Sequence, residues 1–372
     1  MSEKAVRFGT PAKVPAWVNL ALIPLVNLLA AFVLSGIVIV IVGDNPFKAL
    51  EVLIYGAFGY ADAIGYTLYY TTNFIFTGLA VAIAFHCGLF NIGAEGQALM
   101  SGLGVALCAL YLDFLPFWMV IPIAIFAAAF FGAVWAAVPG YLQAKRGSHI
   151  VITTIMFNFI AASIITYLLV EVLIAPGGQS PETREFAEIT WLLFFHDFLP
   201  IPETPLNISF IFALFLSGGF YYFVWHTRWG YEIRVVGQNA TAAKYAGISS
   251  ARNIILAMFI SGALAGFVGV NEILGVHHRL ILDFTGGFGF VGIAVALMGR
   301  NHPVGIFLAA LLFGALYQGG SELAFEMKSI NREMVIVIQG LIILFSGALE
   351  HMFRPRIESF FKRQKSVQAA EA

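Results

Sequence analysis

Apolar residues fill this chain in long blocks that short polar stretches separate. A bilayer core about 30 Å thick requires roughly 20 consecutive apolar residues in a helix, because a helix rises about 1.5 Å per residue. Ten blocks approach that length, and the eighth and ninth are shorter and rich in glycine. The pattern predicts an all-α bundle of ten membrane-spanning helices at residues 17–42, 63–85, 91–112, 117–142, 150–174, 208–226, 254–275, 284–299, 303–320 and 333–350.

The lysine and arginine residues test this count, because the cytoplasmic loops of membrane proteins carry an excess of them. With the N-terminus in the cytoplasm, 15 of the 20 basic residues fall in internal segments and five fall outside. A miscounted span would mix the two groups. We therefore expect both termini in the cytoplasm, with an N-terminal tail at 1–16, a transmembrane domain at 17–350 and a C-terminal tail at 351–372.

The composition separates this chain from soluble enzymes. Charged residues make up 11% and apolar residues 60%, whereas a soluble domain carries roughly 25% charged residues. The sequence contains no GxxxxGK[ST], HExxH or GxSxG motif and no cluster of Cys and His. We therefore expect no catalytic residue, no metal site and no Walker-type ATP site in this chain. A membrane-embedded enzyme would need a cluster of reactive residues, and we find none in this sequence.

The longest internal connection, residues 226–253, contains a short helix signal. Asn239 can cap a helix start, and Gly247 can adopt the left-handed conformation that ends one. A helix of about two turns is marginal in water, so it must pack on something. Either it docks on a partner protein with Tyr245 as an anchor, or it packs on its own membrane domain. The residues expected at such a contact are Gly237, Asn239, Ala242, Ala243, Tyr245 and Gly247.

The external loop at 175–207 contains five prolines and an aromatic, apolar middle between Thr190 and Leu199. Two glycines in the sequence APGGQSPE are not followed by Gly-Lys-Ser/Thr, so they do not form a phosphate-binding loop. This composition favours a lid or a docking surface at the outer face of the membrane.

Glu95 is the only Asp, Glu, Lys or Arg between Ala63 and Leu112. A charge in such a segment usually faces the interior of a helix bundle or a watery path, and it usually has a partner. Two hypotheses remain. Glu95 and Gln97 hydrogen-bond to neighbouring helices and fix the bundle, or they line a polar path or gate. If the segment is helical, Asn91 and Glu95 share one face because they are four residues apart.

Other polar residues interrupt the apolar blocks. Each of them alone is more often an interhelical hydrogen bond than a ligand contact. Together they offer amides and hydroxyls with few charges, which suits a neutral polar solute better than an ion. Thr154 and Asn158 are four apart and share a helix face. The candidates for a translocation path or gate are Asn73, Asn91, Glu95, Gln97, Thr154, Asn158, Asn271 and Glu272.

Four stretches of the sequence resemble the permease subunits of ABC importers in the branched-chain amino acid, ribose and nucleoside group. They are GLAVAIAFHCGLFNIGAEGQ (78–97), ITTIMFNFIA (152–161), RVVGQNATAAKYAGIS (234–249) and GFGFVGIAVALMGRNHPVGIFLAALLFGAL (287–316). The likeness extends from residue 45 to residue 350 or thereabouts. Within the group the chain is most similar to the larger of the two permeases in nucleoside importers.

This resemblance implies several partners. A second, related permease pairs with such a chain, a cytoplasmic ATPase that binds ATP drives it, and an external binding protein or lipoprotein delivers the substrate. No cofactor then belongs to this chain itself. The segment at 237–247 matches the coupling helix that docks on the ATPase. The chain would lie in the plasma (inner) membrane of a bacterium as a multi-pass protein.

The resemblance also implies a substrate, with alternatives. A nucleoside is the expected solute, and a monosaccharide, riboflavin or a branched-chain amino acid are the other candidates. The family often has an acidic residue near Ile150, where this chain has His149. That departure bears on which solute is carried. A carrier driven by an ion gradient is the alternative of another class, but such carriers tend to hold carboxylates near the membrane midplane, and this chain has few.

Overall fold

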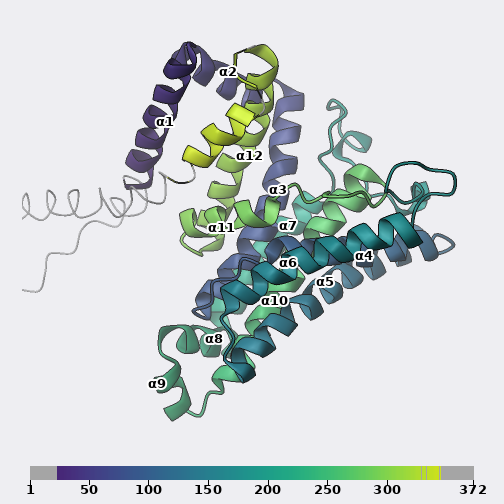
Figure 1. Ribbon diagram of the computed structural model, residues 1–372, viewed down its shortest axis with the longest axis vertical. Coiled ribbons are helices and arrows are strands. Elements are labelled where there is room, and N and C mark those ends of the chain that lie inside the picture. The colour runs from purple at the N-terminus through teal and green to yellow at the C-terminus, as the bar shows by residue number, and fades with distance from the viewer. Residues whose placement is uncertain (1–22, 328, 332, 343, 345–372) are drawn as a thin grey trace, which may run out of the picture. The chain divides into compact units, whose positions relative to one another are not determined.

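The computed structural model describes residues 23–327, 329–331, 333–342 and 344, and over these residues the chain is helical (Figure 1). The β pairing among them is limited to two isolated bridges, between Glu182 and Ile281 and between Phe194 and Asn207. Six of the described helices are long and apolar enough to cross a membrane, or seven if one bent pair is counted as a single span. The prediction of an all-α membrane protein with multiple spans is therefore confirmed.

The chain divides into two compact units, residues 1–49 with 327–372 and residues 50–326. The first unit contains α1 (Ile23–Val42), the first residues of α2 (Pro46–Phe58) and a helix at Glu333–Ile342. Over their described residues, the predicted spans at 17–42 and 333–350 are helical. The predicted tails at 1–16 and 351–372 lie outside the described residues.

The second unit contains the remaining helices. They are α3 (Ala61–His86), α4 (Ala94–Tyr111), α5 (Phe117–Tyr141), α6 (Ile150–Tyr167), α7 (Ser209–His226), α8 (Arg228–Gln238), α9 (Ala240–Tyr245), α10 (Ser250–Gly269), α11 (Phe288–Met298) and α12 (Pro303–Glu326). Short π-helical segments extend three of them: Leu142–Arg146 after α5, Leu168–Val172 after α6 and Val270–His277 after α10.

The core of this unit forms where small residues let helices touch through their main chains. A Cβ atom on Gly262 of α10 would lie 2.0 Å from the carbonyl oxygen of Gly132 in α5, and one on Gly266 would lie 2.5 Å from that of Ala128. In a membrane, where lipid is as apolar as leucine, such close packing is a main source of helix association. Helix α3 is the most buried span, and it contacts α7, α10, α11 and α12.

The structure corrects two expected boundaries. Helix α4 begins at Ala94 rather than at residue 91, because the segment from Cys87 to Gly93 forms a connection. The expected eighth span at 284–299 is reduced to α11, since Gly286 and Gly287 have positive φ angles of 50° and 83° that interrupt the helix. Glycine adopts this conformation without the steric cost that other residues incur.

Candidate functional site

Glu95, in the first turn of α4, is buried and accepts three hydrogen bonds from the segment that leads into α11. Its Oε1 accepts from the hydroxyl of Thr285 and from the amide of Gly287 at 3.0 Å. Its Oε2 accepts from the amide of Gly289 at 2.7 Å. A carboxylate placed at the N-terminus of a helix satisfies free N–H groups and interacts favourably with the helix dipole. Glu95 thus joins the starts of two helices, as the bundle-fixing hypothesis requires.

Asn91 and Gln97 form a reciprocal amide pair just before and within α4. The Asn91 amide nitrogen donates to Gln97 Oε1 at 3.2 Å, and the Gln97 nitrogen donates to Asn91 Oδ1 at 3.3 Å. Asn91 also donates to Ser261 of α10 at 2.8 Å. The expectation that Asn91 and Glu95 share one helix face required a helical segment, and that condition is not met. Asn91 precedes the helix and turns to α10, while Glu95 turns to α11.

The buried face of α6 holds this same connection. Thr154 and Asn158 are both buried on that face, as their spacing predicts. Asn158 accepts a hydrogen bond from the amide of Gly96 at 2.9 Å and donates to the carbonyl of Ile92 at 2.9 Å. The Thr154 hydroxyl donates back to Ile150 O at 2.8 Å within its own helix. The Asn158 side chain therefore supplies hydrogen-bond partners to backbone groups at the start of α4 and in the connection before it, which would otherwise be unpaired.

Glu272 is the centre of a second polar network, toward the other end of α10. Its carboxylate accepts from the Tyr69 hydroxyl at 2.7 Å and from the Asn73 amide at 2.6 Å, both on α3. His277 Nε2 lies 3.4 Å from Glu272 Oε2. The two residues belong to the π-helical segment Val270–His277, whose i→i+5 hydrogen bonding brings residues five apart together.

Asn271 extends this network to the predicted external loop. It donates to Asn73 at 3.0 Å and accepts from Asn207 at 2.9 Å. Asn207 ends the loop at 175–207, just before α7. All eight residues expected in a path or gate are thus at most 8% exposed. Seven of them fall into two hydrogen-bonded groups, one around α4 and one around Asn73 and Glu272, and Thr154 donates within α6.

The loop at 175–207 is anchored to the helix ends around it. Arg184 donates to the carbonyl of Leu110 at 2.7 Å and to Asp113 at 2.9 Å. Arg279 contacts Glu182 at 3.2 Å. The ring of His278 stacks on Trp191 with centroids 3.9 Å apart. Burial holds the pKa of His278 below its usual value.

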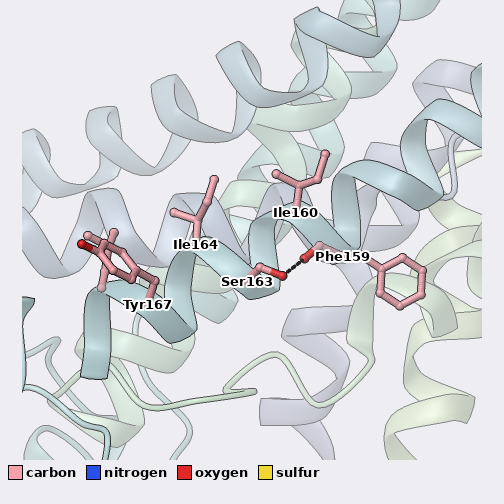
Figure 2. Close-up of a pocket in the computed structure, with 6 residues that line it drawn as sticks. Phe159, Ile160, Ser163, Ile164 and Tyr167 are labelled. Carbon is pink, nitrogen blue, oxygen red and sulfur yellow. Dashed lines mark hydrogen bonds between the residues drawn. The ribbon is translucent and has the colours of Figure 1, made fainter. Parts of the chain in front are cut away.

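The sequence did not point to the exposed face of α6, opposite Thr154 and Asn158. There two adjoining grooves of about 400 and 510 Å³ flank the side chains of Phe159, Ser163 and Tyr167. Figure 2 shows residues that line the smaller groove. Both grooves are shallow and open to the surroundings of the chain. The signal in the sequence is the spacing of these three residues by four, which places them on one face, but an apolar stripe of this kind also fits a lipid-facing helix.

The short helix expected at 237–247 is present. Asn239 precedes α9 and accepts hydrogen bonds from the amides of Thr241 at 3.0 Å and Ala242 at 2.9 Å. Gly247 follows α9 with φ of 74°. Ala243 is fully buried, whereas the Tyr245 side chain is 90% exposed. The helix therefore packs through one small side chain and leaves its one large side chain free of the chain's own bundle.

Gly237, at the end of α8, packs directly on the connection between α3 and α4. A Cβ atom there would lie 2.2 Å from the carbonyl oxygen of His86. Helix α8 is held to α10 by Glu232, which accepts from Arg228 at 2.9 Å and from Asn253 at 3.3 Å. The hydrogen bond from Arg228 keeps the pKa of Glu232 below its usual value.

Comparisons with known proteins agree with these features. The family described as "Branched-chain amino acid transport system / permease component" matches residues 63–347. The guanosine ABC transporter permease protein NupP of Bacillus subtilis is 35% identical over 87% of this chain and 92% of its own length. The nucleoside ABC transporter permease protein NupB of Lactococcus lactis is 34% identical over 94% and 96%.

The glucose ABC transporter permease protein TsgB13 of Haloferax volcanii is 32% identical over 96% of this chain and 95% of its own length. No solved structure matches the chain. The family match covers most of the sequence, and the relatives align over nearly their whole length. The chain therefore belongs to the family of ABC importer permease components, multi-pass membrane proteins that carry a solute and are not themselves enzymes.

Proposed function

We propose that this chain is a permease of a nucleoside importer. The observation that carries the proposal is the similarity to two permeases whose names give guanosine and nucleosides as their substrates, at 35% and 34% identity over nearly full length.

The proposed arrangement in the membrane has ten spans with both termini in the cytoplasm, in the plasma (inner) membrane of a bacterium. The distribution of lysine and arginine supports this orientation. It puts α8 and α9 on the cytoplasmic side and the loop at 175–207 on the outside. The domains are then the tails at 1–16 and 351–372 and a permease domain at 17–350, with cytoplasmic coupling loop 226–253.

The proposed partners are a second permease, an ATPase and an external binding protein. Lactococcus lactis has a second matching permease, NupC, also named for nucleosides, which supports a paired assembly. ATP would bind only to the ATPase. The exposed Tyr245 supports docking of α9 on that ATPase, since large exposed aromatic side chains often anchor protein contacts. In this mechanism ATP-driven closure of the ATPase moves α9, and the two permeases alternate access to a central path.

Within that mechanism, the two polar groups would hold helices that move as units. Glu95, Asn91 and Asn158 tie the start of α4 to α11, α10 and α6. Gln97 supports this arrangement by pairing with Asn91, and Thr154 donates within α6. Asn73, Asn271 and Glu272 tie α3 to the outer end of α10.

A monosaccharide is the second candidate substrate, because a glucose permease is 32% identical over 96% of this chain. Uptake in cells separates the two. Labelled adenosine, guanosine and uridine are offered to cells with and without the chain, with unlabelled ribose and glucose as competitors. We expect deletion to abolish nucleoside uptake, and neither sugar to compete. Competition by glucose, with little effect of unlabelled nucleoside, would replace the nucleoside by a sugar.

A Gly247→Pro variant tests the coupling role of α9 in the same assay. Proline cannot adopt the φ of 74° found at Gly247. We expect the variant to reach the membrane at normal level and to fail to restore uptake. Full uptake by it would contradict the coupling role of α9 while leaving the substrate assignment intact.

A further inference from the structure

One face of α6 is exposed along most of the helix. Phe159 is 66% exposed and Tyr167 62% exposed, and they lie two turns apart. The small side chain of Ser163 lies between the two rings, and a groove lies on each side of it. Figure 2 shows the side chains along the smaller groove. Because Ser163 lies near the middle of the 23-residue span Ile150–Val172, these grooves lie at the depth of the membrane core.

The larger groove, of about 510 Å³, is lined by polar side chains as well as by the aromatic side chains of Phe159 and Tyr167. It is lined by Ser163, Thr166 and Glu171 together with the two aromatic side chains. The π-helical segment Leu168–Val172 brings Glu171 to the same side as Thr166, five residues earlier. π-Helical segments occur frequently at functional sites. No cation partners Glu171 among the residues that the structure describes.

Helix α7 offers a comparison, because it is as exposed as α6 and the structure describes all of it. Its exposed residues from 211 onward are Ile211, Leu214, Phe215, Gly218, Gly219, Tyr221, Tyr222 and His226. Helix α7 therefore also exposes hydroxyl groups, but it contains no Asp or Glu. The exposed carboxylate of Glu171 is what separates the face of α6 from that of α7, because an acidic residue within a membrane span is costly and usually serves a function.

We propose that the exposed face of α6 from Phe159 to Glu171 is the wall along which this chain contacts a nucleoside during transport. The base lies against the rings of Phe159 and Tyr167, since aromatic rings stack on any base. The ribose hydroxyls reach Ser163, Thr166 and Glu171, whose oxygens accept hydrogen bonds. This proposal rests on the proposed nucleoside import. It places the solute on the exposed face of α6 and not among the polar residues that are buried inside the bundle.

The test is the accessibility of a cysteine at Ser163 in the complete transporter in cells. A charged, membrane-impermeant methanethiosulfonate reagent labels a thiol in water but not one covered by lipid or protein. Wild type gives the background, because Cys87 is buried and Cys108 is partly buried. The matched control is Ser217→Cys on α7. Ser217 donates to Ala213 O at 2.9 Å, just as Ser163 donates to Phe159 O at 2.9 Å.

We expect Ser163→Cys to be labelled and Ser217→Cys to stay at background. Guanosine should slow the labelling and glucose should not, and labelling should block uptake. A Ser163→Cys protein that transports guanosine but is not labelled, or is labelled equally with and without guanosine, would overturn the α6 assignment alone. Cells whose unlabelled transporter takes up glucose but no nucleoside would overturn the proposed function, and this inference with it.

A second variant pair tests the stacking. Tyr167→Leu should raise the KM for guanosine several-fold with little change in kcat, and Tyr167→Phe should restore it, because phenylalanine keeps the ring. Equal kinetics for both variants would contradict a stacking role for Tyr167. A fall in kcat alone, at unchanged KM, would also contradict it, because loss of stacking weakens binding.

Discussion

Gly88 and Gly237 touch through their main chains. A Cβ atom on Gly237 would lie 2.8 Å from the amide nitrogen of Gly88, and one on Gly88 would lie 3.2 Å from the Cα of Gly237. Gly88 has φ of 74°, a conformation that favours glycine. This contact joins the segment proposed to meet the ATPase to the connection that positions Asn91 and Glu95. It links α8, which directly precedes α9, to the connection before α4.

Gly237→Ala should disturb this link. The added methyl group would meet the carbonyl oxygen of His86 at 2.2 Å, so the backbone must shift, at a cost of about 1–3 kcal/mol. Thermal unfolding of the purified protein in detergent measures the loss. Gly218→Ala is the control, because a Cβ there meets nothing within 4 Å. Both changes raise helix propensity equally, so equal stabilities of the two variants would contradict the close packing.

Tyr245→Ala should weaken the complex with the ATPase and leave the permease folded, because its side chain is 90% exposed. Interface aromatic residues of this kind contribute about 2 kcal/mol or more to binding. Co-purification of the ATPase and ATP-driven uptake are the measurements. Tyr111→Ala is the control, since Tyr111 is also exposed but ends α4. If the Tyr111 change reduced co-purification as strongly, α9 would not be the docking element.

Glu95→Ala should lower the free energy of unfolding by roughly 2–5 kcal/mol. The change leaves the hydroxyl of Thr285 and the amides of Gly287 and Gly289 without their acceptor, and a buried unsatisfied group costs about 1–3 kcal/mol. Glu95→Gln keeps one acceptor oxygen and should cost less. The exposed Glu188 provides the control, and its change to alanine should have no effect on unfolding. A stable Glu95→Ala protein would instead favour a path or gate role.

The loop at 175–207 should loosen at low pH because of His278. Burial lowers its pKa in the folded protein, so the neutral ring stabilises the fold above its unfolded pKa of about 6.5. That stability is lost as the pH falls through the lower folded value. Limited proteolysis of the loop at 175–207 from pH 8 to pH 5 should show faster cleavage at acid pH.

His278→Asn should remove this pH dependence, since asparagine tolerates the positive φ of 52° at this position and does not titrate. Glu185, His277 and Arg279 also lie near His278 and contribute charge. His277→Gln is therefore the control, and it should keep the acid-induced cleavage. The same pH profile in His278→Asn as in wild type would assign the effect to another group.

The sequence predicted those features that depend on local chemistry. The cap at Asn239 and the left-handed stop at Gly247 follow from side-chain hydrogen bonding and backbone freedom, and both are confirmed. The shared buried face of Thr154 and Asn158 follows from helical spacing and is confirmed as well. Their roles in transport remain proposals.

Features that depend on tertiary contacts were missed. The helix α4 starts late because Asn158 of α6 satisfies the backbone of the connection before it, which no local pattern shows. The amphipathic helix α8 was expected only as part of a loop. Its few apolar residues indicate a helix only once its contact with α10 is known. The π-helical segments have no sequence signal of comparable strength, yet they position Glu171 and His277.

The most direct test of the whole account is ATP-dependent uptake in proteoliposomes that contain this chain, its second permease, the ATPase and the binding protein. The account predicts that labelled guanosine enters only with ATP, that the Tyr245→Ala transporter fails, and that an ion gradient without ATP drives nothing. Guanosine uptake driven by an ion gradient in the absence of ATP would contradict the importer mechanism. ATP-driven uptake of glucose but not guanosine would contradict the nucleoside assignment.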